Sequence, residues 1–150
     1  MEETIVIPDI LDLIEKDKLP RELYAPDGFL VYKPYDPAIE SPLLVNRKKW
    51  KLFANYTPIE GRPEEDTWIV KLNTTEQYVE IHDPELVWLL YYIRVVHPGA
   101  TPEEAVNHEL AEVEKDGGKF KNDDELIGYA MYLYTALAIA IAYGLLVVVE

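Results

Sequence analysis

The feature that most constrains the fold is an uncharged segment at the carboxyl end of the chain. From Leu126 to Val149 there is no charged side chain, and the only polar side-chain groups are Thr135 and four tyrosine hydroxyls. A segment of this kind has to be covered by the protein's own core, by a partner subunit or by a lipid bilayer. The chain upstream is rich in charged residues, so the fold depends on what covers this segment.

Local signals divide this segment into a helix and a strand. Asn122 and Glu125 have the spacing of a capping box, and Gly144 suits the position that follows a helix. Residues 145–149 are rich in β-branched side chains, which is typical of a buried strand. We therefore expect packing in a core or subunit interface. The alternative is a C-terminal membrane anchor, since a helix over the segment's twenty-four residues would span ~36 Å of a bilayer whose hydrocarbon layer is about 30 Å thick.

Two further helices are expected between residues 83 and 118. Asp83 and Pro84 supply an N-cap and a first-turn proline, and an almost wholly apolar run follows up to Val96. Thr101 and Glu104 form a capping box that opens the second helix, whose outer face is acidic. Together with the C-terminal helix, the second half of the chain therefore predicts three helices.

The N-terminal half is expected to form strands. The clearest hairpin joins residues 68–72 to 77–82 through a four-residue loop, which sets position i opposite position 149 − i. One face of this hairpin then carries only apolar side chains, namely Trp68, Val70, Leu72, Val79 and Ile81. Residues 57–66 are expected to form a loop. The sequence predicts an α+β fold: an antiparallel sheet of about four strands in the N-terminal half, then three helices and a short C-terminal strand.

Length and composition favour a single intracellular domain. The 150 residues are 49% hydrophobic, which suits one domain over 1–150, with residues 1–82 mainly β, residues 83–150 mainly α and one shared core. There is no cysteine, so disulfides and thiolate metal sites are excluded. The N-terminus lacks the pattern of a secretory signal, and we expect a cytoplasmic protein. Eleven prolines and abundant charge resemble the composition of thermophile proteins.

The charge of the chain is strongly acidic and unevenly distributed. The net charge is −14, and residues 59–150 hold six basic against eighteen acidic side chains. Such a surface repels nucleic acid phosphates and attracts cations or basic proteins. We therefore expect a partner that is either a second copy of this chain or a basic protein, and we expect no cofactor.

Two groups of side chains could hold a metal ion in a hydrolase or nuclease. Glu104, His108 and Glu112 follow each other at helical spacing and share one helix face, although the pattern lacks the second histidine of a zinc-protease helix. Asp66, Glu80 and His82 lie near one end of the hairpin. The predicted register places Glu80 and His82 on one face and Asp66 on the other, so a shared ion would need a bulge.

One basic cluster could bind single-stranded nucleic acid. Arg47, Lys48, Lys49 and Lys51 surround Trp50, and Phe53 and Tyr56 follow, so charge and stacking are close in sequence. A row of lysines also protects an exposed strand from pairing with other sheets, which is the structural interpretation of the same residues.

The preferred functional interpretation is a non-catalytic interaction or assembly protein. Self-association through the apolar C-terminal region is its simplest form, and inhibition of a basic or nucleic-acid-binding partner is a related form. The carboxylates expected on the interaction surface are Glu64, Glu65, Asp66, Glu103, Glu109 and Glu114. The alternatives are a metal-dependent hydrolase, a single-strand binder and a tail-anchored membrane protein.

Overall fold

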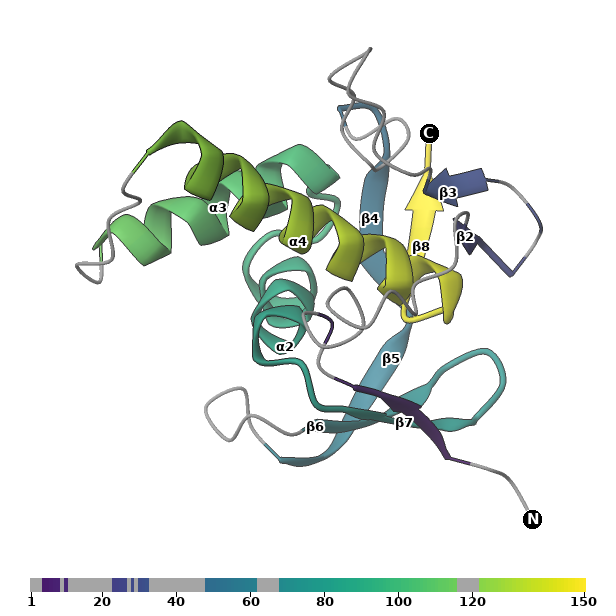
Figure 1. Cartoon of the computed structure of the whole chain (residues 1–150). Helices are drawn as coiled ribbons and strands as arrows, with labels where there is room; N and C mark the ends of the chain where they lie inside the picture. Colours follow the sequence, from purple (N-terminus) through teal and green to yellow (C-terminus); the bar gives the residue numbers. More distant parts are fainter. Residues whose placement is uncertain are drawn as a thin grey trace.

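A computed structural model shows an α+β fold in which three helical segments pack together, and two of them also pack against strands (Figure 1). The structure describes residues 4–8, 10, 23–26, 28, 30–32, 48–61, 68–115 and 122–150. The strands are β1 (Ile5–Ile7), β2 (Leu23–Tyr24), β3 (Leu30–Tyr32), β4 (Lys51–Ala54), β5 (Tyr56–Gly61), β6 (Trp68–Leu72), β7 (Tyr78–Ile81) and β8 (Leu146–Val149). The helices are α2 (Pro84–Tyr91), its π-helical continuation η2 (Tyr92–Val96), α3 (Pro102–Lys115) and α4 (Asp123–Ala142).

The main sheet has four strands in the order β1-β7-β6-β5. The β6–β7 hairpin has the register predicted from its loop, with Trp68 opposite Ile81 and Val70 opposite Val79. All five side chains expected on its core face are buried. The expectation of a purely antiparallel sheet was wrong, because β1 pairs in parallel with β7. The sheet is therefore mixed.

The loop expected over residues 57–66 was wrong in its first part. Residues 57–61 continue β5, which pairs with β6 along the outer side of the sheet. Pro58 is tolerated there because the pairing shifts register between Pro58 and Glu60, and a proline fits at such a bulge or on an outer strand. Residues 62–66 lie outside the described part of the chain.

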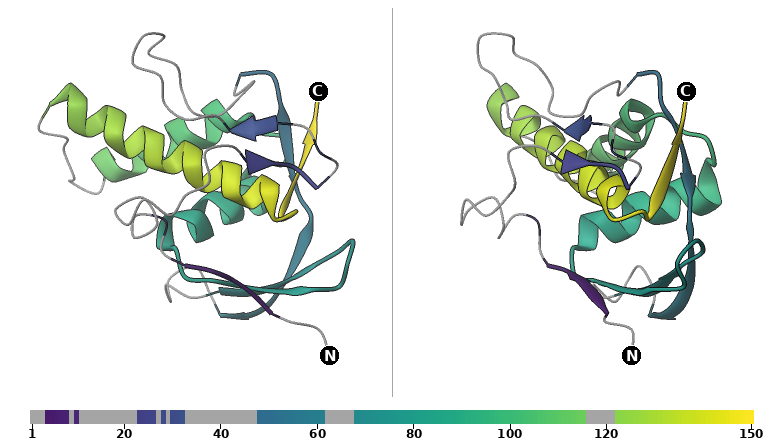
Figure 2. Two further views of the ribbon diagram at one scale, coloured as in Figure 1. Left: turned by 45° about the vertical axis from the view of Figure 1, so that its right-hand side comes forward. Right: turned by 90° about the vertical axis from the view of Figure 1, so that its right-hand side faces the viewer.

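β4 and β5 form one long strand that joins two sheets (Figures 1 and 2). β4 pairs with β8, and β5 pairs with β6. Asn55 stands between them: its backbone N–H donates to the Leu145 carbonyl at 2.9 Å, and its side-chain amide donates to the Gly144 carbonyl at 2.9 Å. The turn after α4 is thereby tied to the main sheet, and Gly144 adopts the positive φ expected of a residue that ends a helix.

The protein's own core covers much of the uncharged C-terminal segment. Every residue from Tyr132 to Ile141 is buried, and Leu145 and Leu146 are buried after the turn. α4 contacts α2 and α3, and β8 returns to β4 as the expected C-terminal strand. By length and composition α4 is also the one described helix that could cross a membrane, with 56% of its apolar window buried in this fold.

Asp83 joins three parts of the fold at the start of α2. Its side chain is fully buried, and its Oδ1 accepts hydrogen bonds from the Leu86 N–H at 2.9 Å and the Tyr132 hydroxyl at 2.6 Å. Its Oδ2 accepts from the Ile10 N–H at 2.8 Å. The expected N-cap is therefore confirmed, and the same carboxyl group also holds α4 and the segment after β1.

Replacing Asp83 with alanine is expected to lower the free energy of unfolding by about 3 kcal/mol or more, because three buried donors lose their acceptor. Urea denaturation monitored by circular dichroism measures the change. Thr135→Val is the matched control, since it removes a buried hydroxyl of α4 that bonds only the Met131 carbonyl, and it should cost less than about 1 kcal/mol. Equal losses in the two variants would contradict the role assigned to Asp83.

Candidate functional site

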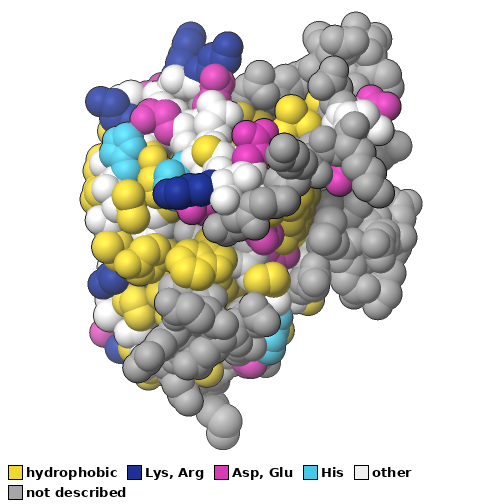
Figure 3. Space-filling model, turned by 90° about the vertical axis from the view of Figure 1, so that its left-hand side faces the viewer, with side chains coloured by type: hydrophobic (Ala, Val, Ile, Leu, Met, Phe, Trp, Pro, Cys, Tyr) yellow, Lys and Arg dark blue, Asp and Glu magenta, His cyan; other side chains and the backbone are white. Residues whose placement is uncertain are grey.

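The most distinctive site is a pocket of about 420 Å³ between α2–η2 and α3. Figure 3 shows this side of the molecule, where hydrophobic side chains gather close to histidine and acidic side chains. We call it the acidic aromatic pocket. The described residues that line it supply three carboxylates, three aromatic rings, one imidazole and two valines, namely Glu85, Trp88, Tyr91, Tyr92, Val96, His108, Glu109, Glu112 and Val113.

Helical spacing explains why these residues share the pocket. Glu85, Trp88, Tyr92 and Val96 recur every three or four residues along α2–η2, so they face one direction. On α3, Glu109 and Glu112 are similarly spaced. The two helical segments pack against each other, and the pocket opens between these two rows.

Aromatic rings form the walls of the pocket. The Tyr92 ring stacks on the His108 imidazole with a centroid separation of 4.2 Å and an interplanar angle of 17°. Trp88 and Tyr91 meet edge to face at 5.9 Å. These contacts reduce the freedom of the rings and leave flat apolar surfaces beside the carboxylates.

The π-helical turn η2 begins at Tyr92, inside the pocket. The His97 N–H donates to the Tyr92 carbonyl at 2.8 Å, which closes a wider turn than an α-helix makes. Just before it, the buried Tyr56 hydroxyl donates to the Leu90 carbonyl at 2.8 Å, and the Arg94 guanidinium lies 5.9 Å from the centre of the Tyr56 ring. Single π-helical turns of this kind are frequent at functional sites.

Glu109 is the most unusual side chain in the pocket. It is only 8% exposed, and none of the described residues donates a hydrogen bond to it. Among the described residues its nearest potential cation is His108, whose Nδ1 lies 3.7 Å from Oε1. Burial, together with the negative charges of Glu85 and Glu112, raises the pKa of Glu109 to about 7. A buried carboxylate without a hydrogen-bond donor is costly to ionise.

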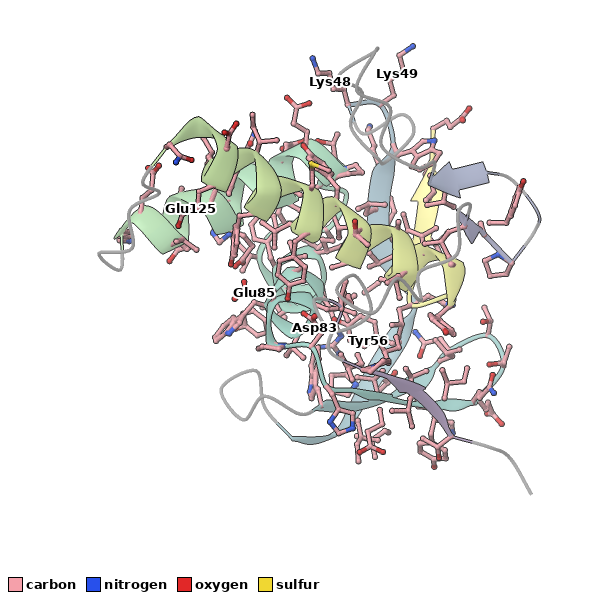
Figure 4. The ribbon with its side chains drawn as sticks, in the orientation of Figure 1. Lys48, Lys49, Tyr56, Asp83, Glu85 and Glu125 are labelled. Atoms are coloured by element: carbon pink, nitrogen blue, oxygen red, sulfur yellow. The ribbon has the colours of Figure 1, made fainter. Side chains whose placement is uncertain are left out.

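The second carboxylate, Glu85, differs from Glu109 in having a donor. The Tyr129 hydroxyl of α4 donates a hydrogen bond to Glu85, and burial raises the pKa of Glu85 above its usual range despite that bond. Figure 4 shows Glu85 close to Asp83 at the start of α2, below α4 in that view. Glu112, the third carboxylate, lies 3.8 Å from His108 Nε2 and is partly exposed.

The proposed metal group on α3 is only partly assembled. His108 and Glu112 approach each other, but Glu104 takes part in the capping box with Thr101 and lies 3.6 Å from Nδ1 of His97. In the second group, Glu80 and His82 pair at 2.9 Å, and Asp66 lies outside the described residues. Over the described ranges, no three histidine, aspartate or glutamate side chains are placed to hold one metal ion. Both metal sites stay predictions.

The lysines of the basic cluster are exposed, whereas most of the aromatic residues beside them are buried. Lys48, Lys49 and Lys51 are exposed, and Figure 4 shows Lys48 and Lys49 projecting beyond the start of β4. Trp50 is buried, and its Nε1–H lies within hydrogen-bond distance of Glu150. Tyr56 is buried too, so Phe53 is the exposed aromatic residue of this strand. Arg47 lies outside the described residues, and nucleic-acid binding here stays a prediction.

The carboxylates expected on one interaction surface have different surroundings. Glu114 is exposed and Glu103 is half-buried, whereas Glu109 faces the pocket rather than solvent. Glu64, Glu65 and Asp66 lie outside the described residues. The sequence carried a signal for Glu109 that was missed: it continues the buried positions Pro102, Ala105 and Val106 at helical spacing.

Comparison with protein-family models, with curated proteins and with solved structures found no match to this chain. Within the described part of the chain, the pocket combines a cavity, aromatic walls and a buried carboxylate without a hydrogen-bond donor. Such a lining is suited to an organic cation.

Glu109→Gln is expected to stabilise the fold at pH 8 by roughly 1–3 kcal/mol and to have little effect near pH 4, below the pKa of the unfolded carboxyl group. The pKa of Glu109 is raised from 4.5 to about 7, so the wild-type protein loses stability between about pH 4.5, where the unfolded chain ionises, and about pH 7, where the folded protein ionises as well. Glutamine cannot ionise and avoids this loss. Urea denaturation at both pH values measures the difference in unfolding free energy between the variant and the wild type. A ¹³C titration of the Glu109 carboxyl in the wild type should have its midpoint near 7.

Glu76→Gln is the control for this measurement. Glu76 is exposed in the turn between β6 and β7, so its replacement removes one negative charge without touching the pocket. Its effect on stability should be small and similar at the two pH values. If Glu109→Gln behaved like Glu76→Gln, Glu109 would not be the buried titrating group.

Proposed function

We propose that the chain is a non-catalytic binding protein for a positively charged partner protein, and that the acidic aromatic pocket receives a cationic side chain of that partner. The observation that carries the proposal is Glu109, a carboxylate nine-tenths buried in the wall of an aromatic pocket. No lysine or arginine of the described residues pairs with it. A cation from outside would neutralise it where the lysines and arginines of the described residues do not.

The overall charge supports the same partner. Residues 59–150 hold eighteen acidic and six basic side chains and contain the whole pocket. Such an excess draws basic proteins towards the surface and speeds their association, most strongly at low ionic strength. Long-range attraction and the local carboxylates of the pocket then act in the same direction.

Self-association has less support than a basic partner. The sequence favours it because of the long uncharged segment at the carboxyl end. Residues 132–141 are buried within the fold, and α4 and β8 pack against the chain's own helices and strands. The described structure therefore covers much of the tail without a second copy, although Ile127, Val147 and Val149 remain exposed.

An enzymatic role has a weaker basis in the pocket. A carboxyl group with a pKa of about 7 would suit general acid–base chemistry. The described part of the lining, however, contains no serine, threonine or lysine beside it that could act as a nucleophile, and the chain has no cysteine. Carboxylates, rings and one imidazole are better suited to holding a cation than to transferring a group.

A fluorescein-labelled peptide of twelve residues containing lysine, arginine and glycine tests the proposal by fluorescence anisotropy. We expect binding at low salt that weakens as salt rises, because exposed charges contribute to it. Glu109→Gln should weaken binding about tenfold or more, since it removes the buried counterion of the cation. The variant is expected to be at least as stable as the wild type, so a loss of binding cannot come from unfolding.

Glu76→Gln is again the control and should change the dissociation constant less than about twofold, as a remote charge does. The proposal is wrong if the unmodified protein does not bind the peptide at low salt. It is also wrong if the two variants lose the same affinity, because binding would then reflect net charge and not the pocket.

A further inference from the structure

We propose further that the pocket selects a guanidinium group, so that the partner side chain it receives is arginine and not lysine. This inference rests on the proposed function and adds the chemical class of the ligand. It is carried by three properties of the lining: aromatic walls, a carboxyl group that accepts no hydrogen bond from the described residues, and the burial of that carboxyl group.

The walls offer flat surfaces to a flat cation. Tyr92 and His108 lie nearly parallel, and Trp88 and Tyr91 stand edge to face, so ring surfaces border the pocket from both helical segments. A guanidinium group is planar and stacks on such rings, in addition to the attraction between a cation and an aromatic face. An ammonium group is a compact point charge that gains only the second of these interactions.

The carboxyl group of Glu109 suits a forked donor. Neither of its oxygens accepts a hydrogen bond from the described residues. The Glu85 carboxyl, in contrast, accepts a hydrogen bond from Tyr129, and the Asp83 carboxyl accepts three. A guanidinium can donate two parallel hydrogen bonds to the two oxygens of one carboxylate. Lysine can approach the same carboxylate but cannot match this geometry.

Burial strengthens the preference for arginine. With Glu109 only 8% exposed, a cation that reaches it has to lose much of its water. The guanidinium is more weakly hydrated than an ammonium, so its transfer into the pocket costs less free energy. A volume of about 420 Å³ lies within the range of ligand pockets and can hold the end of an arginine side chain.

Arginine binding should also release protons. The groups that face Glu109 are Glu85 on α2, His108 and Glu112 on α3, and Tyr129 on α4, with Asp83 beyond them. Since the pKa of Glu109 is about 7, a large part of it is protonated at pH 6.5, and a cation held against it favours the ionised form. The proton leaves to the buffer, where calorimetry can count it.

The test uses three peptides that share a glycine–serine framework and carry four arginines, four lysines or four citrullines. Citrulline has nearly the shape of arginine and no charge. Calorimetry at pH 6.5 in two buffers of different ionisation enthalpy should show the arginine peptide binding about tenfold or more tightly than the lysine peptide, the size of effect expected from one well-formed forked contact. The citrulline peptide should not bind, and proton release should vanish in Glu109→Gln.

Trp88→Leu and Phe53→Leu form a matched pair of variants for the aromatic wall. The two rings are similarly exposed, at 37% and 38%, but Phe53 lies on β4 outside the pocket. Trp88→Leu should reduce the preference for arginine over lysine at least threefold, and Phe53→Leu should leave it unchanged.

Each outcome has a distinct meaning. If the lysine peptide binds as tightly as the arginine peptide or more tightly, the guanidinium inference fails while the proposed function stands. If neither peptide binds, both fail. An arginine preference that persists in Glu109→Gln and Trp88→Leu would assign the selectivity to another surface and overturn the inference for this pocket.

Discussion

The fold depends on one buried carboxyl group that is fully hydrogen-bonded. Asp83 caps α2, receives the Tyr132 hydroxyl from α4 and receives the Ile10 N–H from the segment that follows β1. These three segments are far apart in sequence, and each would otherwise bring an unsatisfied polar group into the core. Because the donors converge on one side chain, the start of α2 is fixed relative to both the sheet and the C-terminal helix.

That fixed start sets the position of the acidic aromatic pocket. Glu85 follows Asp83 by two residues and reaches Tyr129 on α4, while Trp88, Tyr91 and Tyr92 follow along the same helix. The Tyr56 hydroxyl holds the Leu90 carbonyl just before the π-helical turn, which ties this helix to the strand β5. One wall of the pocket is therefore held from the sheet, from α4 and from its own cap, and α3 supplies the other wall.

Much of this fold follows from local patterns in the sequence. The four-residue loop and the alternation of Trp68, Val70 and Leu72 determined the hairpin register, and caps at Asp83, Thr101 and Asn122 marked the starts of the helices. The parallel pairing of β1 was missed because it depends on contacts with β7 and Asp83 that lie more than seventy residues away. The pocket was missed for a related reason: its two rows of side chains meet only when α2 and α3 pack together. Glu109 was assigned to solvent because its charge was weighed above its position on the buried stripe of α3.

Asp83 and Glu109 show how differently two buried carboxyl groups can act in one protein. Asp83 accepts three hydrogen bonds and stabilises the fold, so its burial needs no partner from outside. Glu109 accepts no hydrogen bond from the described residues and faces two other carboxylates. Its ionisation therefore lowers the stability of the fold, and the full loss is present above pH 7. Leucine or glutamine at that position would avoid this cost. A destabilising carboxylate in the wall of a pocket is typical of a functional site. A binding partner that places a cation against the carboxylate recovers the free energy that its ionisation costs the fold.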